Sequence, residues 1–222
     1  MMLMSLPLIL RNIVQSLQQY RIAISEAVEG EGRGGSLKDE GTVKRFLNNE
    51  FPGHIIDEKA RKFGDMIVLD YDKVTKHVVN IKTSEMSSSD NCFSKGGIVY
   101  ALTNIECTDS RLGPMNLCKM VELIHTHGHH EPMKDYWFLC IDKKDSANVL
   151  CRGAKQIQNW KININPSNIL QVDWKAEKNC DPVERNWNSA YNVLVNGAKN
   201  STFAFINNLP PQWKEEIKLM LH

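Results

Sequence analysis

Long apolar runs, closely paired cysteines and a strong net charge are all missing from this chain of 222 residues. A formal charge of +1 creates no overall basic field that would announce a nucleic-acid partner, although it leaves room for a local basic groove. None of the six cysteines forms a C-x-x-C pair, and a chain of this length needs no disulfides to hold a core. We therefore expect reduced thiols in a cytoplasmic protein.

The apolar start of the chain, MMLMSLPLIL, is too short to cross a membrane and is interrupted by Arg11. Since no positively charged residue precedes it and no small-residue cleavage site follows, we expect neither a signal peptide nor a membrane partner. Apolar residues at helical spacing from Leu6 to Leu17 instead predict a buried first helix from Ser5 to about Val28.

The order of the predicted elements indicates an α/β fold, built as a single domain over residues 1–222. Helices come first, strands lie in the middle and helices come last, which predicts a central mixed β-sheet flanked by helices. A second helix is expected from Leu37 to Asn49, with Ser36 as its N-cap and with Asp39 and Glu40 in its first turn.

The remaining elements are read from β-branched and aliphatic runs and from helical spacing. Residues Ile98–Asn104 fit a strand and a helix equally well. Strands are predicted at Met66–Tyr71, His77–Ile81, Asp135–Asp142, Asn148–Cys151, Trp160–Pro166 and Asn168–Trp174. Helices are predicted at Asn116–His125, Val183–Val195 and Trp213–Leu221.

Three polar side chains fall at one end of two neighbouring predicted strands. Asp65 directly precedes the first strand, and Asn80 and Lys82 lie two residues apart on the second. Since residues i and i+2 of a strand share a face, a hairpin would bring the three together. A carboxylate, a second oxygen and an ammonium group suit phosphodiester cleavage with Mg²⁺, which binds oxygen ligands. The alternative is that Asp65 caps a turn, Asn80 is an ordinary sheet residue and Lys82 is a solvated strand end.

The pattern GD…NIK resembles the PD-(D/E)xK nuclease signature, in the setting found in type II restriction endonucleases. In this resemblance Asp65 matches the first acid, Asn80 the second-acid position and Lys82 the lysine. Gly64 stands where the family often has proline, and Asn80 replaces the usual acid, which removes one negative charge from the metal site. A subgroup, the MspI-like enzymes, carries an amide there, and VVNIKTS is similar to its second strand.

The resemblance extends to the preceding helix, where the family usually adds a carboxylate. LKDEGTVKRFL is similar to that helix and places Glu40 in the matching position, ahead of Asp39 and Glu50. FSKGGIVYALTN resembles the segment after the catalytic lysine in EcoRV-like enzymes, and NPSNILQVDW resembles a late strand of small restriction enzymes. The family implies a restriction-endonuclease-like central mixed β-sheet flanked by helices.

The resemblance implies an Mg²⁺-dependent endonuclease that cuts double-stranded DNA at a fixed site and leaves 5′-phosphate ends. It also implies a homodimer, whose two-fold symmetry matches a palindromic site, and a companion DNA methyltransferase. Asp65, Asn80 and Glu40 would bind the metal, and Lys82 would position water and phosphate. Two alternatives stay open: a nuclease of the same superfamily without a fixed site, and a non-catalytic DNA- or protein-binding module with a decayed nuclease fold.

Three polar stretches are predicted to be loops that contact DNA, although each is also consistent with a plain connector. They are GEGRGGS, SSSDNCFSKGG and DWKAEKNCDPVERN, and their basic and amide side chains suit phosphates and base edges. The candidate DNA-binding residues are Arg33, Ser87, Ser88, Asn91, Lys95, Lys175 and Lys178.

The histidine-rich segment HTHGHH, from His125 to His130, has no cysteine or acid at zinc-site spacing. It therefore predicts the end of a helix followed by a polar loop. His125 would then lie near a helix C-terminus, where partial positive charge is favourable. A contact with DNA phosphate is a further alternative.

Overall fold

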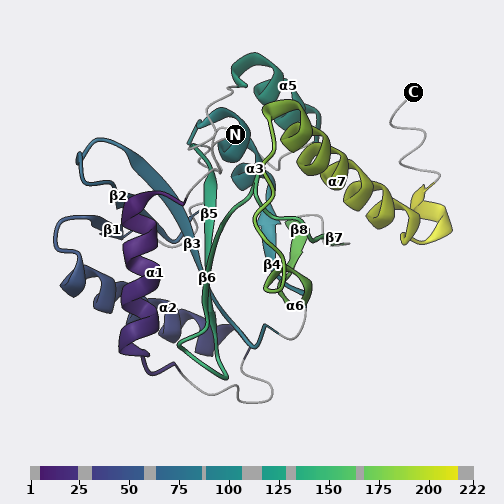
Figure 1. Cartoon of the computed structure of the whole chain (residues 1–222). Coiled ribbons are helices and arrows are strands. Elements are labelled where there is room, and N and C mark those ends of the chain that lie inside the picture. Colours follow the sequence, from purple (N-terminus) through teal and green to yellow (C-terminus); the bar gives the residue numbers. More distant parts are fainter. Residues whose placement is uncertain are drawn as a thin grey trace.

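The computed structural model describes residues 6–24, 32–57, 64–86, 89–106, 117–128, 134–163 and 168–214. Within these ranges the strands form a five-stranded and a three-stranded sheet, with helices packed around them (Figure 1). The buried apolar residues form two core clusters that share the strands of the larger sheet. The fold is therefore α/β with a mixed sheet flanked by helices, which confirms the predicted class.

The larger sheet has the strand order β1-β2-β3-β5-β6. Strands β3 and β5 are parallel to each other, and the other neighbours are antiparallel. The strand bounds are Ile55–Asp57 (β1), Met66–Leu69 (β2), Lys76–Ser84 (β3), Tyr136–Asp142 (β5) and Val149–Gly153 (β6). The two strands that flank the candidate nuclease motif are thus the antiparallel pair β2 and β3.

Side-chain alternation along β3 explains its place in the middle of the sheet. Val79 and Ile81 pack into one core cluster, whereas Val78 packs into the other, on the opposite face. Strand β5 beside it is buried along its whole length. Strands that are apolar on both faces are stable only where helices cover both faces.

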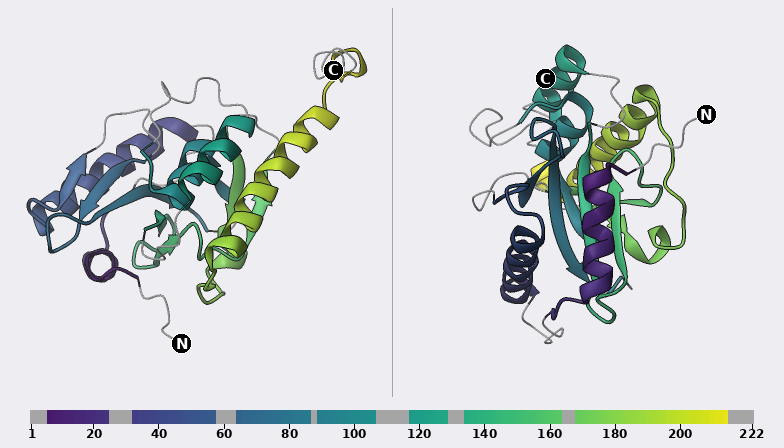
Figure 2. Two further views of the ribbon diagram at one scale, coloured as in Figure 1. Left: turned by 90° about the horizontal axis from the view of Figure 1, so that it is seen from above. Right: turned by 60° about the vertical axis from the view of Figure 1, so that its left-hand side comes forward.

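Helices α1 (Leu8–Tyr20) and α2 (Gly32–Glu50) belong to the core cluster of Val79 and Ile81. Helix α1 lies alongside β6 (Figure 2). Its buried residues have the helical spacing that predicted this helix: Ile9, Leu10, Ile13 and Leu17.

Helices α3 (Lys95–Thr103), α5 (Leu117–His127) and α7 (Trp187–Asn207) belong to the second cluster. Helix α3 is buried from its second residue to its last, so it shows no polar face. This uniform burial is the reason why its sequence fits a strand as well as a helix. Helix α7 runs along one side of the molecule, and its C-terminal end projects beyond the sheets (Figure 2).

A smaller antiparallel sheet, with the order β4-β8-β7, packs against α7. The bounds are Ser89–Ser94 (β4), Trp160–Ile162 (β7) and Asn168–Asp173 (β8), and the short helix α6 (Trp174–Glu177) follows β8. Aromatic rings join this sheet to β5. The Phe93 ring lies 5.2 Å from that of Phe138 and 5.3 Å from that of Trp160.

The prediction of a loop over GEGRGGS is wrong from Gly32 onward, because α2 begins at Gly32. Ser36 is therefore not an N-cap, and Asp39 and Glu40 lie beyond the first turn. Each glycine disfavours a helix by only about 1 kcal/mol, a cost that packing of the helix can outweigh. Val43 and Leu47 of α2 are fully buried against the sheet and supply that packing.

The prediction of a loop over SSSDNCFSKGG is wrong from Ser89 onward, because Ser89–Ser94 form β4 and α3 begins at Lys95. The Ser94 side chain caps α3 by accepting a hydrogen bond from the Gly97 N–H at 3.1 Å. The buried Phe93 ring gives this polar segment a core contact. One aromatic residue among polar neighbours was too weak a pattern to predict the strand.

The C-terminal third departs from prediction in its boundaries. The loop predicted after β8 contains α6, and the helix predicted from Val183 begins at Trp187 and extends to Asn207. Asn186 caps α7, since its side chain accepts a hydrogen bond from the Ser189 N–H at 2.9 Å. The final predicted helix lies mostly outside the described residues.

In the part of the chain that the structure describes, no helix combines the length and the apolar character needed to cross a membrane. Cys118, Cys140, Cys151 and Cys180 are free thiols. Cys140 is fully buried on β5, where it packs with the aromatic residues of the second core cluster.

Candidate active site

Strands β2 and β3 separate at Asp65. The paired residues of the two strands end at Met66 and Val79, so Asp65 lies at the end of the ladder. The Asp65 N–H donates to the Val79 carbonyl at 3.0 Å, and Asp65 Oδ2 accepts a hydrogen bond from the Ile81 N–H at 2.7 Å. The carboxyl thus takes the place of a backbone acceptor and is held at the point where the two strands part.

Gly64, immediately before Asp65, lies too close to β3 to carry a side chain. A Cβ atom at this position would lie 2.5 Å from Cγ1 of Val78. Carbon atoms in favourable contact are about 3.5–4.0 Å apart. Close packing against Val78 therefore explains glycine at the position where the resembled family often has proline.

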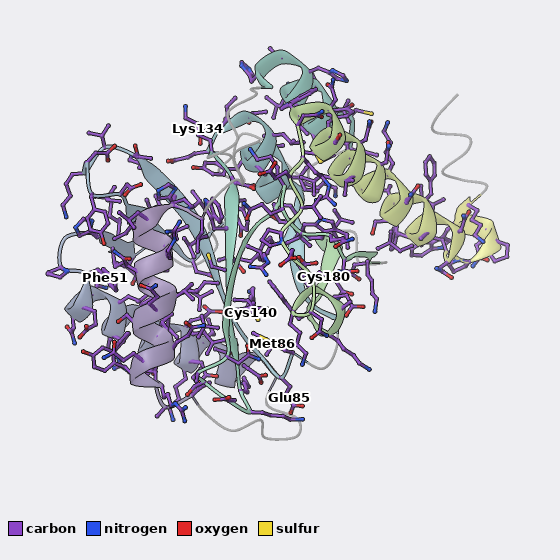
Figure 3. The ribbon with its side chains drawn as sticks, in the orientation of Figure 1. Phe51, Glu85, Met86, Lys134, Cys140 and Cys180 are labelled. Atoms are coloured by element: carbon purple, nitrogen blue, oxygen red, sulfur yellow. The ribbon has the colours of Figure 1, made fainter. Side chains whose placement is uncertain are left out.

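Asn80 and Lys82 lie two residues apart on β3, so they share a face of the sheet. Both are half-buried, and their partners on β5 are Phe138 and Cys140 (Cys140 is labelled in Figure 3). The Lys82 ammonium is close enough to act electrostatically on the Asp65 carboxyl. The structure thus brings together the three side chains that the sequence placed at one end of the sheet.

Burial raises the pKa of Asp65 above its usual value, because desolvation disfavours the charged carboxylate. The positive charge of Lys82, the Ile81 N–H and the charge of Lys44 partly offset this effect, and Asp57 adds to it. A bound cation would favour the charged form and reverse the balance.

Burial also raises the pKa of Glu40 on α2, and the nearby Asp65 charge raises it further. Lys82 and Lys44 act in the opposite direction. Glu40 therefore faces the same group of side chains, and we refer to Glu40, Asp65, Asn80 and Lys82 as the candidate site.

The other two carboxyls considered on α2 lie elsewhere. Asp39 is buried, with its Oδ2 atom 3.2 Å from Lys143 Nζ and 3.2 Å from Thr83 Oγ1. Glu50 is exposed at the last residue of α2. Glu40, by contrast, acts electrostatically with both Asp65 and Lys82.

The amide of Asn80 lies near the hydroxyl of Tyr136, the first residue of β5, and acts to lower the pKa of that hydroxyl, which burial raises. Within the described residues, Asn80 Oδ1 is buried and has no hydrogen-bond partner. Leaving such an acceptor unsatisfied costs about 1–3 kcal/mol. An unpartnered buried atom calls for an explanation, and a bound water or ion is one of those that apply.

The cofactor that the resemblance implies is Mg²⁺, which binds carboxylate and amide oxygens. Glu40 and Asp65 offer carboxylate oxygens, and Asn80 offers its unpartnered amide oxygen. Across the described ranges, no group of three His, Cys, Asp or Glu side chains could hold a metal ion. The third donor here is the amide oxygen of Asn80 beside two carboxylates, and this set of oxygens suits Mg²⁺.

The residues predicted to contact DNA in the first half of the chain are only partly described. Ser87 and Ser88 lie outside the described residues, and the backbone places Arg33 in α2 and Asn91 in β4. Lys95 is the half-buried first residue of α3, and burial lowers the pKa of its amine. The loops predicted around Arg33, Asn91 and Lys95 are therefore regular elements.

In the second half of the chain, Lys175 lies on α6 and Lys178 follows it, and both are exposed. Arg185, in the same predicted loop, binds the protein instead. Its Nη1 donates hydrogen bonds to the carbonyls of Lys155 at 2.8 Å and Ile157 at 2.7 Å. Because they are exposed, Lys175 and Lys178 are accessible to a phosphate backbone. Arg185 instead attaches the segment before α7 to the carbonyls of Lys155 and Ile157.

The histidine-rich segment begins as predicted. His125 and His127 occupy the last turn of α5 and are exposed, and His129 and His130 lie outside the described residues. The His125 ring is hydrogen-bonded to the Tyr191 hydroxyl at 3.1 Å. This part of the segment therefore links α5 to α7.

Sequence reasoning missed two residues that act on the candidate site, Tyr136 and Lys44. The signal for Tyr136 was a hydroxyl in a buried strand, since a buried tyrosine usually needs a hydrogen-bond partner. The signal for Lys44 was its position four residues after Glu40, the spacing at which charges meet on a helix. Lys44 Nζ also lies 2.7 Å from Asp57 Oδ1, which joins α2 to β1.

The chain matches no protein-family model, and no curated protein matches it.

Proposed function

We propose that this protein is a type II restriction endonuclease of the PD-(D/E)xK kind, which cleaves double-stranded DNA with Mg²⁺. The observation that carries the proposal is the grouping of Asp65, Asn80, Lys82 and Glu40 where β2 leaves β3. Carboxylates beside an unpartnered oxygen and an ammonium group form the set that metal-assisted phosphodiester hydrolysis requires.

Each side chain has a role that follows from its chemistry. Asp65 and Glu40 supply negative charge to a cation, and Asn80 supplies a neutral oxygen. Lys82 orients or deprotonates the attacking water and offsets the charge that grows on the phosphate. Mg²⁺, when bound, polarises the scissile phosphate and lowers the pKa of bound water. Cleavage leaves a 5′-phosphate and a 3′-hydroxyl.

The proposed assembly is a homodimer on a palindromic site, because two-fold symmetry lets each subunit cut one strand. A companion DNA methyltransferase would protect the host's own sites. A second candidate function, a DNA- or protein-binding module with a decayed nuclease fold, is favoured by one observation. Asn80 takes the place of an acid and gives the metal site one negative charge fewer.

The deciding experiment incubates the purified protein with plasmid and phage DNA, with and without Mg²⁺, followed by sequencing of the ends. Discrete bands that require Mg²⁺ support the restriction enzyme. A smear indicates a nuclease without a fixed site, and no Mg²⁺-stimulated cleavage supports the decayed module.

The matched variants are Lys82→Ala and Lys76→Ala, since both lysines lie on β3 and Lys76 is exposed at its far end. Loss of a group that moves protons in the reaction usually slows it about 10²–10⁴-fold. We expect that loss for Lys82→Ala, with DNA binding retained in gel shifts without Mg²⁺, and near-normal cleavage for Lys76→Ala. Full activity of Lys82→Ala would remove the mechanism.

A further inference from the structure

Asn80 and Tyr136 are diagonal neighbours on adjacent strands, because Val78 pairs with Tyr136 and Asn80 pairs with Phe138. Asn80 Oδ1 is buried and has no hydrogen-bond partner among the described residues, so the end of the amide that can pair with the Tyr136 hydroxyl is the nitrogen. An amide nitrogen only donates, and the phenolic oxygen of Tyr136 therefore accepts. The oxygen of Asn80 is left free.

This direction is important because the two ends of an amide differ. A cation binds the oxygen and is repelled by the NH₂ group, so a rotation of half a turn about the last side-chain bond would spoil the site. An aspartate needs no such control, since its two oxygens are equivalent. A chain with Asn80 at this position gains from a partner that fixes the amide.

Tyr136 is placed to be such a partner. It is 3% exposed, and its ring lies 5.0 Å from Phe93 and 5.2 Å from Phe138, so the hydroxyl cannot swing away. Its backbone is also fixed, because the Ala154 N–H donates to the Tyr136 carbonyl at 2.8 Å. Burial raises the pKa of Tyr136 well above its usual value, so the hydroxyl stays neutral beside the site.

We infer that Tyr136 is a positioning residue, which holds the amide of Asn80 so that its oxygen is free to bind a divalent cation. The inference rests on the proposed function for the identity of the cation and the site. It adds a specific role for a buried hydroxyl outside the four residues of the candidate site.

The test is a cycle of four proteins: the wild type, Tyr136→Phe, Asn80→Asp and the double variant. Mg²⁺ binding without DNA is measured by isothermal titration calorimetry, and cleavage is measured as a function of Mg²⁺ concentration. Loss of a group that orients a metal ligand usually weakens metal binding about 10–100-fold. We expect at least a tenfold weaker Mg²⁺ affinity for Tyr136→Phe, with cleavage recovering at high Mg²⁺.

The diagnostic result lies in the Asn80→Asp background, where the hydroxyl should no longer matter. There, Tyr136→Phe should change Mg²⁺ affinity less than twofold, because either carboxylate oxygen can bind. An equal loss in both backgrounds would indicate general damage to the fold and overturn the inference. So would an unchanged affinity in the single variant.

A further control is Tyr100→Phe, which removes another buried hydroxyl, on α3, and should leave Mg²⁺ affinity unchanged. Failure of the proposed function looks different from failure of this inference. A wild-type protein that binds Mg²⁺ but cuts no DNA loses the proposed activity, while the calorimetric cycle still tests Tyr136. A wild-type protein that binds no Mg²⁺ overturns both.

Discussion

Thr83 Oγ1 donates a hydrogen bond to the buried Asp39 Oδ2 at 3.2 Å, and this contact fastens α2 to β3. Thr83 follows Lys82 in the sequence, and Asp39 precedes Glu40. Thr83 lies on the face of β3 opposite Lys82, and its bond to Asp39 therefore fixes the distance between Glu40 on α2 and Lys82 on β3. Lys143 Nζ, 3.2 Å from the same carboxyl oxygen, balances the buried charge.

Replacing Asp39 by alanine should destabilise the protein, because Lys143 and Thr83 lose their shared partner. A hydrogen bond to a charged group contributes about 1.5–3 kcal/mol, and we expect a loss of that size in the free energy of unfolding. Urea denaturation measures it. The matched control is Glu122→Ala, which breaks the exposed Lys119–Glu122 pair and should cost less than about 1 kcal/mol. Similar losses in both variants would contradict the anchoring role.

Packing at Gly64 leads to a second prediction. Gly64→Ala places a methyl group against Val78 Cγ1, so the start of β2 and Asp65 must move. Overpacking of this kind costs about 1–3 kcal/mol, and a displacement of about 1 Å at a reacting group can reduce a rate about 100-fold. We expect both effects, measured by denaturation and by plasmid cleavage.

The rescue is the double variant Gly64→Ala/Val78→Ala, in which the new methyl group fills space that Val78 vacates. It should cleave faster than Gly64→Ala alone. A control glycine is Gly41 in α2, where a Cβ would meet nothing within 4 Å. Gly41→Ala should raise stability by about 1 kcal/mol, the usual gain inside a helix. Cleavage by the double variant no faster than by Gly64→Ala would show that Val78 is not the obstacle.

The central strands and the grouping of Asp65, Asn80 and Lys82 could be predicted because their signals are local. Strands β2, β3 and β5 are continuous apolar runs, and the period of two along β3 alone puts Asn80 and Lys82 on one face. A hairpin between consecutive strands then brings Asp65 beside Val79 and Ile81, the two neighbours of Asn80.

The features that prediction missed depend on contacts between distant segments. Strand β4 exists because it pairs with β8, whose residues begin far along the chain, and its own composition is that of a loop. Helix α2 begins at Gly32, because packing of its later turns outweighs the weak helical preference of glycine. The role of Tyr136 also depends on a neighbouring strand, since β5 lies beside β3 only in the folded sheet.

Charge removal at Asp65 should stabilise the metal-free protein at neutral pH. Burial raises the pKa of this carboxyl in the folded state above its value in the unfolded chain. Its ionisation therefore favours unfolding, and stability is lost as the pH rises from below 4 through the folded-state pKa. Asp65→Asn removes this loss and keeps an oxygen for the Ile81 N–H.

Urea denaturation at pH 3.5 and pH 7, both without metal, tests the effect. Asp65→Asn should be more stable than the wild type at pH 7, and the advantage should shrink or vanish at pH 3.5. The same variant should fail to cleave DNA, as expected of a side chain kept for function at the expense of stability. A variant less stable than the wild type at pH 7 would show that the charged carboxylate stabilises the fold.

Asp135, which is fully buried next to β5, should control a second pH dependence that is separate from the candidate site. Burial raises its pKa to about 6, although the ammonium of Lys155 and the backbone N–H groups of Lys155 and Tyr136 oppose the shift. Its protonation favours the folded state, so its contribution to stability is present below about pH 4 and is lost as the pH rises through about 6. One pKa unit corresponds to about 1.4 kcal/mol, so the whole change is about 3 kcal/mol.

Asp135→Asn tests this dependence because its effect should change sign with pH. Near pH 4 the variant should be less stable than the wild type, since an amide cannot accept hydrogen bonds from both the Lys155 and the Tyr136 N–H groups, at 3.0 and 2.7 Å. Above pH 7 it should be the more stable protein, because no charge is buried. Denaturation of both proteins from pH 4 to pH 8 gives the pH at which their free energies of unfolding are equal. A difference that stays constant over this range would mean that Asp135 does not titrate there and that its charge is already balanced in the fold.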